Sequence, residues 1–207
     1  MRRITASMLL VVVGLGCAEG EIGGPVEVDG DGVSFQLNGQ AYALSGSPAR
    51  GAGELLDASF TIARADSVGG FAVIGYERTG DNVGNLIVLQ APREVKTFNC
   101  TASTVPCHQS PGEWHGRYIT GVQSLGTANA LRYFHLASGT LTVTQVGPAR
   151  LRATFNAVFR ASDGKPNDTL TVENGSIDVP YVSDQVTDGS LQCLLSLVGV
   201  IAGECRS

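Results

Sequence analysis

Residues 151–160 alternate between apolar and polar side chains almost without a break. Leu, Ala and Phe hold the odd positions, Arg, Thr and Asn hold the even positions, and only Val158 interrupts the polar set. Successive side chains of a β-strand point to opposite faces, so a period of two predicts a strand with one buried and one solvated face. Such strands are typical of antiparallel sheets, and this segment therefore favours a β-rich fold.

Two Asn-Gly dipeptides, Asn38-Gly39 and Asn174-Gly175, each lie between two short alternating runs. Asn-Gly suits a type I′ turn, in which both central residues have positive φ, so each dipeptide predicts a β-hairpin. Pro180 has no backbone N–H and is expected at a sheet edge or a strand end. Strands are predicted at residues 33–37, 40–44, 58–65, 70–77, 85–90, 114–122, 130–136, 140–146, 151–160, 169–173 and 176–181.

The composition agrees with a single β-rich domain. Glycine accounts for 27 of the 207 residues, about twice the usual share, and no long helical period separates the strands. Hydrophobic residues make up 43% and charged residues 16%, which is enough apolar surface for a core. We therefore predict an all-β domain over residues 33–207, an antiparallel β-sandwich or open barrel built from hairpins, with a short disulfide-linked C-terminal segment. A net charge of −5 offers no basic surface for nucleic acid.

The first sixteen residues have the pattern of an export signal. Residues 1–3 include two arginines, and residues 8–13 form an apolar run well short of the roughly 20 residues of a membrane-spanning helix. The run ends in Gly14-Leu15-Gly16-Cys17, which resembles the lipobox of bacterial lipoproteins. This resemblance implies that the signal peptide, residues 1–16, is removed and that Cys17 receives acyl chains such as palmitate.

Lipidation of this kind would hold the protein on a membrane without a spanning helix. Ala18 follows the cysteine, where lipoproteins retained in the inner membrane of many diderm bacteria carry Asp, so the resemblance favours the outer membrane. Residues 17–32 combine acidic residues with Gly and Pro, which predicts a lipidated N-terminus and a flexible acidic tether. The alternative is an ordinary secretory signal cleaved near Gly16 or Ala18, which would leave Cys17 as a free thiol.

A second resemblance concerns the β-rich domain itself. Residues 139–143, 153–157 and 170–179 look like the C-terminal pattern of uncharacterised bacterial lipoproteins that are predicted to be all-β. The first hairpin, from Phe35 to Tyr42, is also similar to theirs. The resemblance implies an envelope lipoprotein, and it brings no catalytic residues with it.

The five cysteines are an odd number, which lipidation of Cys17 would reduce to four. Cys100, Cys107, Cys193 and Cys205 are then predicted to form two disulfides. Local pairing along the chain is the simplest of the three possible connectivities. Cross-pairing is the alternative, and it would tie the C-terminus to the loop between the first two cysteines.

The segment between the last two cysteines has an apolar stripe. Four of its residues fall at helical spacing: Leu191, Leu194, Leu195 and Val198. A continuous helix would hold Cys193 and Cys205 about 18 Å apart, whereas bonded cysteines need Cα atoms within about 7 Å. A disulfide between them therefore requires the chain to turn back, at Gly199 or Gly203.

Metal-binding and catalytic residue types cluster at one place, where His108, Glu113 and His115 follow Cys107. Zinc would need three or four ligands in a recognised spacing, and a Cys/His hydrolase would need a free thiol. We therefore expect a disulfide-closed loop with surface histidines, no metal site, no cofactor and no catalytic residue, with Trp114 as a packing residue. Whether the protein is an enzyme stays open, although the absence of known catalytic motifs argues against it.

The sequence as a whole predicts a membrane-anchored envelope lipoprotein whose β-domain is a binding or structural module. Its partners would be the membrane, through the lipid anchor, and a protein, a glycan or a small apolar ligand, but not nucleic acid. The first alternative is a β-barrel carrier of a small apolar ligand, which needs an internal cavity. A hydrolase or metal enzyme that uses His108, Glu113 and His115 is less favoured.

Overall fold

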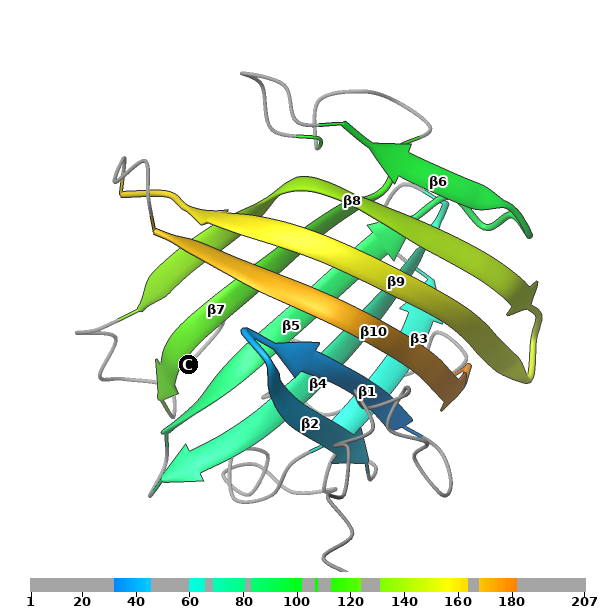
Figure 1. Ribbon diagram of the computed structural model, residues 1–207. Coiled ribbons are helices and arrows are strands. Elements are labelled where there is room, and N and C mark those ends of the chain that lie inside the picture. The colour runs from blue at the N-terminus through cyan, green and yellow to red at the C-terminus, as the bar shows by residue number, and fades with distance from the viewer. Residues whose placement is uncertain are drawn as a thin grey trace, which may run out of the picture.

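The structure is a computed structural model, and it describes residues 32–45, 60–65, 69–80, 83–101, 107, 113–123, 131–163 and 168–181. Most of these residues lie in strands and none of them lies in an α-helix (Figure 1). The strands are β1 (Gly32–Leu37), β2 (Gln40–Ser45), β3 (Phe60–Ala65), β4 (Phe71–Gly80), β5 (Val83–Ala91), β6 (Thr97–Cys100), β7 (His115–Gln123), β8 (Arg132–Val146), β9 (Arg150–Ala161) and β10 (Thr169–Pro180). The expected signal peptide, Cys17, most of the tether, His108, Cys193 and Cys205 lie outside the described residues.

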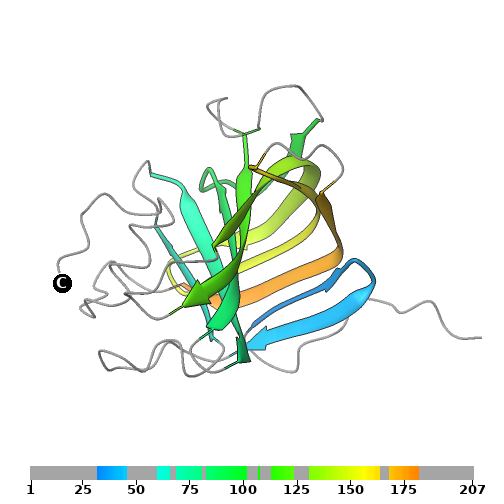
Figure 2. The same ribbon diagram turned by 90° about the vertical axis from the view of Figure 1, so that its left-hand side faces the viewer.

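The strands form one antiparallel sheet that curls into a nearly closed barrel (Figures 1 and 2). Hydrogen-bonded neighbours follow the order β2, β1, β10, β9, β8, β7, β5, β4 and β3, and β6 pairs with β8 outside this path. The two ends of the sheet approach each other, because β3 contacts β1, β2 and β10, and Ala63 forms a parallel bridge with Tyr181. The predicted all-β antiparallel class is confirmed, and of the two predicted architectures the structure has the open barrel.

Large apolar side chains fill the interior of the barrel. The aromatic residues of this core are at most 3% exposed: Phe35, Phe71, Phe98, Trp114, Tyr118, Phe134, Phe155 and Phe159. The ring centroids of Phe35 and Phe155 are 6.4 Å apart, and the ring centroids of Tyr118 and Phe159 are also 6.4 Å apart. In β9 the odd positions are buried and the even ones are exposed or half-buried, as the alternation predicts. The core therefore lies inside the barrel, and the polar side of β9 lies outside.

The hairpin predicted at Asn38-Gly39 is confirmed. Both residues have positive φ, 49° for Asn38 and 82° for Gly39, and β1 and β2 pair antiparallel on either side of them. The turn is also tied to β10, since the Asn38 N–H donates to the Thr171 carbonyl over 2.8 Å and Asn38 Oδ1 accepts from the Thr171 N–H over 2.9 Å. The turn residue thus attaches the first hairpin to the rest of the sheet.

The hairpin predicted at Asn174-Gly175 is wrong, because residues 169–180 form the single strand β10. Asn174 has a φ of 54°, and the register with β9 shifts between Val172 and Gly175, so the dipeptide forms a β-bulge. Apolar residues change from even positions, such as Val172, to odd positions, such as Ile177, across the dipeptide. A bulge and a hairpin both keep such a pattern on one face, and the sequence pattern does not distinguish them.

Two other strand predictions also change. The separate strands expected at 130–136 and 140–146 are one strand, β8, with register shifts between Leu136 and Ser138 and between Val143 and Gln145. The short strand β6 was not expected from the sequence, and it pairs with the middle of β8. The two register shifts in β8 are β-bulges, which let this long strand bend with the curved sheet.

Candidate functional site

The outer surface of β6, β8, β9 and β10 carries uncharged polar side chains in rows. In the first row Thr97 lies opposite Thr142, Thr142 lies opposite Thr154, and Thr154 lies opposite Ser176. The Oγ1 atoms of Thr97 and Thr142 are hydrogen-bonded at 3.1 Å. Because residues opposite each other on one face of an antiparallel pair are side-chain neighbours, four hydroxyl groups follow one another across the sheet.

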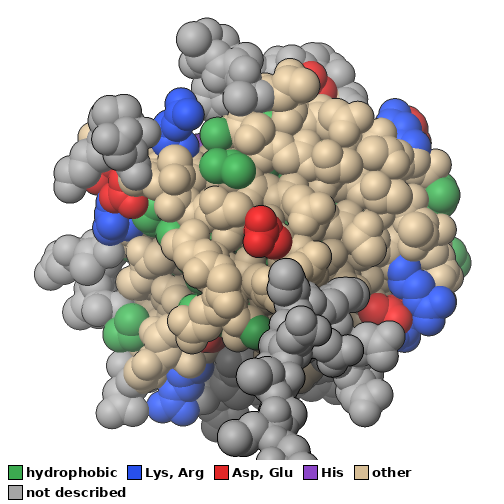
Figure 3. Space-filling view, viewed as in Figure 1, with side chains coloured by type: hydrophobic (Ala, Val, Ile, Leu, Met, Phe, Trp, Pro, Cys, Tyr) green, Lys and Arg blue, Asp and Glu red, His purple; other side chains and the backbone are tan. Residues whose placement is uncertain are grey.

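The second row runs beside the first and contains amides. Thr140 Oγ1 donates to Asn99 Oδ1 over 3.2 Å, and Thr140 lies opposite Asn156. The Asn174 N–H then donates to Asn156 Oδ1 over 2.9 Å, so the bulge in β10 brings Asn174 to the end of this row. We call these two rows the neutral face. In Figure 3, viewed from this side, charged side chains gather near the margins, apart from one acidic group near the middle.

A hollow lies within the neutral face, where β8, β9 and β10 run side by side. Its lining consists of Ser138, Gly139, Thr140, Asn156, Ala157, Val158, Thr171, Val172, Glu173 and Asn174. Val158 is the residue that interrupts the polar side of β9, and it is half-buried. The hollow thus combines an apolar side chain with hydroxyl groups, amides and the Glu173 carboxylate.

Charged residues mark one margin of the neutral face. Arg150 Nε donates to Asp178 Oδ1, and Arg152 Nε lies 3.2 Å from both oxygens of the same carboxylate. Partial burial alone would raise the pKa of Asp178, but the hydrogen bonds and positive charges of Arg150 and Arg152 outweigh it and lower that pKa. Opposite charges therefore compensate each other at this margin.

The two rows of the neutral face offer uncharged hydrogen-bonding groups, and the Glu173 carboxylate adds one negative charge at the hollow. Hydroxyl and amide groups both donate and accept hydrogen bonds, and Val158 adds an apolar contact inside the hollow. A sugar ring has the matching features, because its hydroxyl groups lie at the edge and its C–H groups on the face. The arrangement suits the binding of a neutral, hydroxyl-rich molecule better than the binding of an ion.

A second polar group lies on the inward side of the barrel, formed by Tyr42, Glu77, Asn85 and Tyr118. Asn85 Nδ2 donates to Glu77 Oε2 over 3.2 Å. Burial, followed by the negative charge of Glu77, raises the pKa of Tyr118, and the same two causes raise the pKa of Tyr42. Both phenols therefore stay protonated at neutral pH, where they hydrogen-bond and do not act as bases.

The histidines do not assemble a catalytic or metal centre within the described part of the chain. His115 lies opposite Gln90, His135 lies opposite Arg117, and all four line a small surface hollow. Among the described residues, no three His, Cys, Asp or Glu side chains are grouped so that they could hold a metal ion. Trp114 is fully buried in the core, as expected for a packing residue.

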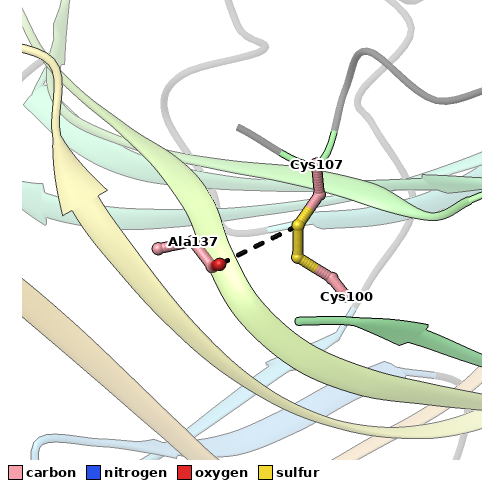
Figure 4. Close-up of a disulfide and its surroundings, with 3 residues drawn as sticks. All are labelled: Cys100, Cys107 and Ala137. Carbon is pink, nitrogen blue, oxygen red and sulfur yellow. Dashed lines mark hydrogen bonds between the residues drawn. A yellow bond between two sulfur atoms is a disulfide. The ribbon is translucent and has the colours of Figure 1, made fainter. Parts of the chain in front are cut away.

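A disulfide joins Cys100 and Cys107, whose Cα atoms are 5.9 Å apart (Figure 4). This is the local pairing, and it closes the loop that leads from β6 toward β7. Both cysteines are buried, and Cys107 Sγ lies 3.9 Å from the carbonyl oxygen of Ala137 in β8. The disulfide therefore holds Cys107 beside β8 and removes both thiols from any nucleophilic role.

Comparisons of the chain with models of protein families, with curated proteins and with solved structures find no match. In the part of the chain that the structure describes, no helix is long and apolar enough to cross a membrane. Fold and surface chemistry therefore provide the structural arguments about function, and the lipoprotein resemblance stays a prediction from sequence.

The neutral face was not singled out from the sequence, where its positions appear only as the solvent side of strands. A signal was nevertheless present. The even positions of 151–160 and of 140–144 contain mostly Thr and Asn, which are uncharged and can donate and accept hydrogen bonds. Val158 was the second signal, because it is the one apolar residue on the polar side of β9.

Proposed function

We propose that this protein is an exported envelope lipoprotein, anchored in the outer membrane through acylated Cys17, whose barrel binds a neutral saccharide. The anchor is supported by the lipobox-like residues 14–17 and by the apolar run before them. The fourteen residues between Cys17 and the start of β1 at Gly32 could span up to about 50 Å if extended, which is enough to hold the barrel clear of lipid headgroups.

The hollow in the neutral face is the observation that carries the binding proposal. Thr140, Asn156 and Asn174 supply uncharged donors and acceptors, and Val158 supplies an apolar contact for one face of a sugar ring. Glu173 can accept hydrogen bonds from two neighbouring sugar hydroxyls with its two oxygens. Binding sites for small ligands typically combine such apolar contacts with a few convergent polar groups.

Two alternative functions have less support. A carrier of an apolar ligand would need an empty interior, but Phe35, Phe71, Phe155 and Phe159 are among the large side chains that fill this barrel. A hydrolase or metal enzyme would need an activated nucleophile or a ligand cluster, and the described residues contain no candidate metal cluster. A binding module that uses its outer surface is therefore the better hypothesis.

Calorimetric titration with three neutral hexasaccharides, maltohexaose, cellohexaose and chitohexaose, tests the binding proposal. We expect at least one of them to bind in the micromolar to millimolar range, as is common for small ligands that make few contacts. The double variant Thr140→Val, Asn156→Ala should bind that sugar at least tenfold more weakly, since it loses two hydrogen-bonding groups of the hollow.

Thr79→Val is the matched control, because Thr79 is exposed on β4 and lies outside the hollow. This control should bind the sugar as tightly as the natural sequence does. The saccharide proposal would be overturned if none of the three sugars binds at a concentration of about 10 mM. It would also be overturned if the double variant binds the sugar as tightly as the natural sequence does.

A further inference from the structure

The side of the barrel formed by β3, β4, β5 and β7 carries large apolar residues on both surfaces, and Arg64, Gln90, His115 and Arg117 lie at one end of its outer surface. Its inner surface belongs to the interior core, with Val73 and Leu89 as examples. Its outer surface carries six large apolar residues that are at most 2% exposed: Ile62, Ile74, Tyr76, Leu86, Val88 and Ile119. None of these six belongs to the interior core cluster, so they form a separate buried surface, which we call the outer apolar patch.

The register of the strands makes the outer apolar patch continuous. Ile62 lies opposite Ile74, and Ile74 lies opposite Val88. In the next row Tyr76 lies opposite Leu86, and Leu86 lies opposite Ile119. Side chains opposite each other on one face are in contact, so the six residues form two adjacent apolar rows over four strands.

A surface of this kind needs a cover, because an antiparallel sheet that faces water on one side carries polar residues there. The outer surface of these strands faces away from β9 and β10 (Figure 2). Where β2 contacts β4, Leu44 approaches Gly75 from the interior side. Within the described part of the chain, no strand packs across the outer apolar patch.

The last described residue shows which part of the chain lies nearest to the patch. Tyr181 follows β10 and bridges to Ala63, which lies next to Ile62 on β3. Residues 182–207 therefore begin at the edge of the patch. These 26 residues are long enough to cross four strands, which are about 4.8 Å apart.

The composition of residues 182–207 complements the patch. Leu191, Leu194, Leu195 and Val198 form an apolar stripe at helical spacing. Residues 46–59, which precede β3, offer only two adjacent leucines, Leu55 and Leu56, among small and polar residues.

We propose that residues 182–207 dock their apolar stripe on the outer apolar patch, so that the C-terminal segment covers this side of the barrel. The occupant is thus the protein's own C-terminus and not a partner protein. This leaves the neutral face, on the other side of the barrel, as the open binding surface.

Site-specific photo-crosslinking in the full-length protein tests this docking. A benzophenone amino acid replaces Tyr76, where it substitutes one aromatic side chain for another, and in a second variant it replaces Ile119. The control carries the same group at Val158, on the neutral face. Peptide mapping by mass spectrometry should place the crosslinks from positions 76 and 119 in residues 182–207, with at least tenfold higher yield than from position 158.

Crosslinks from both positions to residues 46–59, or to a second copy of the chain, would overturn the proposal. A second measurement does not depend on placing a bulky group in the patch. In full-length Leu194→Asp, Leu195→Asp, amide hydrogen exchange in β4 and β5 should accelerate at least tenfold while β9 is unchanged, and Gln192→Asp is the matched control. Unchanged exchange in β4 and β5 would also contradict the docking.

Discussion

Gly175 shows how closely the core is packed around the bulge in β10. A Cβ atom at this position would lie 2.4 Å from Phe155 Cδ1 and 2.6 Å from the Phe155 carbonyl oxygen. We expect Gly175→Ala to lower the free energy of unfolding by about 1–3 kcal/mol, because Phe155 is buried and has little room to move. Urea denaturation followed by the fluorescence of Trp114, the sole tryptophan, measures this change.

Gly147→Ala is the matched control for that prediction. No atom lies within 4 Å of the position that its Cβ would occupy, so the change should alter the free energy of unfolding by less than about 0.5 kcal/mol. Equal effects of the two substitutions would contradict the close packing of Gly175 against Phe155.

Tyr118 should resist ionisation in the folded barrel. Burial and the negative charge of Glu77 raise its pKa, so the folded state resists loss of the phenolic proton. The stability that the protonated Tyr118 phenol contributes is complete below the unfolded-state pKa of about 10. It is lost as the pH rises from that value through the raised pKa of the folded state. Ultraviolet titration of Tyr118→Phe should show one delayed phenol fewer than titration of the natural sequence, and the fall of stability above a pH of about 10 should be less steep in this variant. If all phenols titrate together, the claim that burial raises the pKa of Tyr118 is contradicted.

At the scale of single elements, Asp178 joins β10 to β9 at the margin of the neutral face. The hydrogen bonds from Arg150 and Arg152 lower its pKa, so the stabilisation is present above pH 4 (about the unfolded pKa) and is lost as the pH falls through the lowered value. Asp178→Asn should cost at most about 1 kcal/mol at pH 7, since the group is partly exposed. The stability of the variant should also decline less on acidification.

The comparison for Asp178 is Glu94→Gln, which removes the exposed ion pair with Lys96. That pair links neighbouring residues outside the strands, so its loss should change the free energy of unfolding by less than about 0.5 kcal/mol at neutral pH. A steeper decline in Asp178→Asn than in the natural sequence would refute the lowered pKa.

The Cys100–Cys107 disulfide should stabilise the β6 region through the loop that it closes. For a loop of this size the chain-entropy model gives about 2–3 kcal/mol. The double variant Cys100→Ser, Cys107→Ser should therefore unfold at lower urea concentration, and its free energy of unfolding should depend on urea at least as steeply, because the unfolded chain without the disulfide exposes at least as much surface. An unchanged midpoint would mean that the disulfide does not constrain the unfolded chain.

Some elements could be predicted from the sequence because local rules determine them. The alternation in β9 and the Asn38-Gly39 turn depend only on side-chain period and on backbone preference. The bulge at Asn174 could not be predicted, because its two flanking runs have the same pattern as a hairpin, and pairing with β1 and β9 decides between them. The neutral face could not be predicted either, since it depends on which strands become neighbours.

At the scale of the whole molecule, the two sides of the barrel have different surfaces. The outside of β8, β9 and β10 carries the uncharged rows of the neutral face, with charged residues such as Arg152 and Asp178 at its margin, whereas the outside of β3, β4, β5 and β7 carries the outer apolar patch. In the sequence, the run 71–76 is apolar at both parities, which is typical of a strand covered on both faces. This asymmetry is the basis for assigning binding to one side and a covering segment to the other.

The intact mass of the protein extracted from membranes, with and without reduction, tests the proposed anchored binding module most directly. We expect a mass that lacks residues 1–16 and includes acyl chains on Cys17. On reduction this mass should increase by about four hydrogens, two for each of two disulfides, one of which is Cys100–Cys107. A soluble product without acyl chains would contradict the anchor and return Cys17 to the free thiols. The barrel would then belong to a secreted protein.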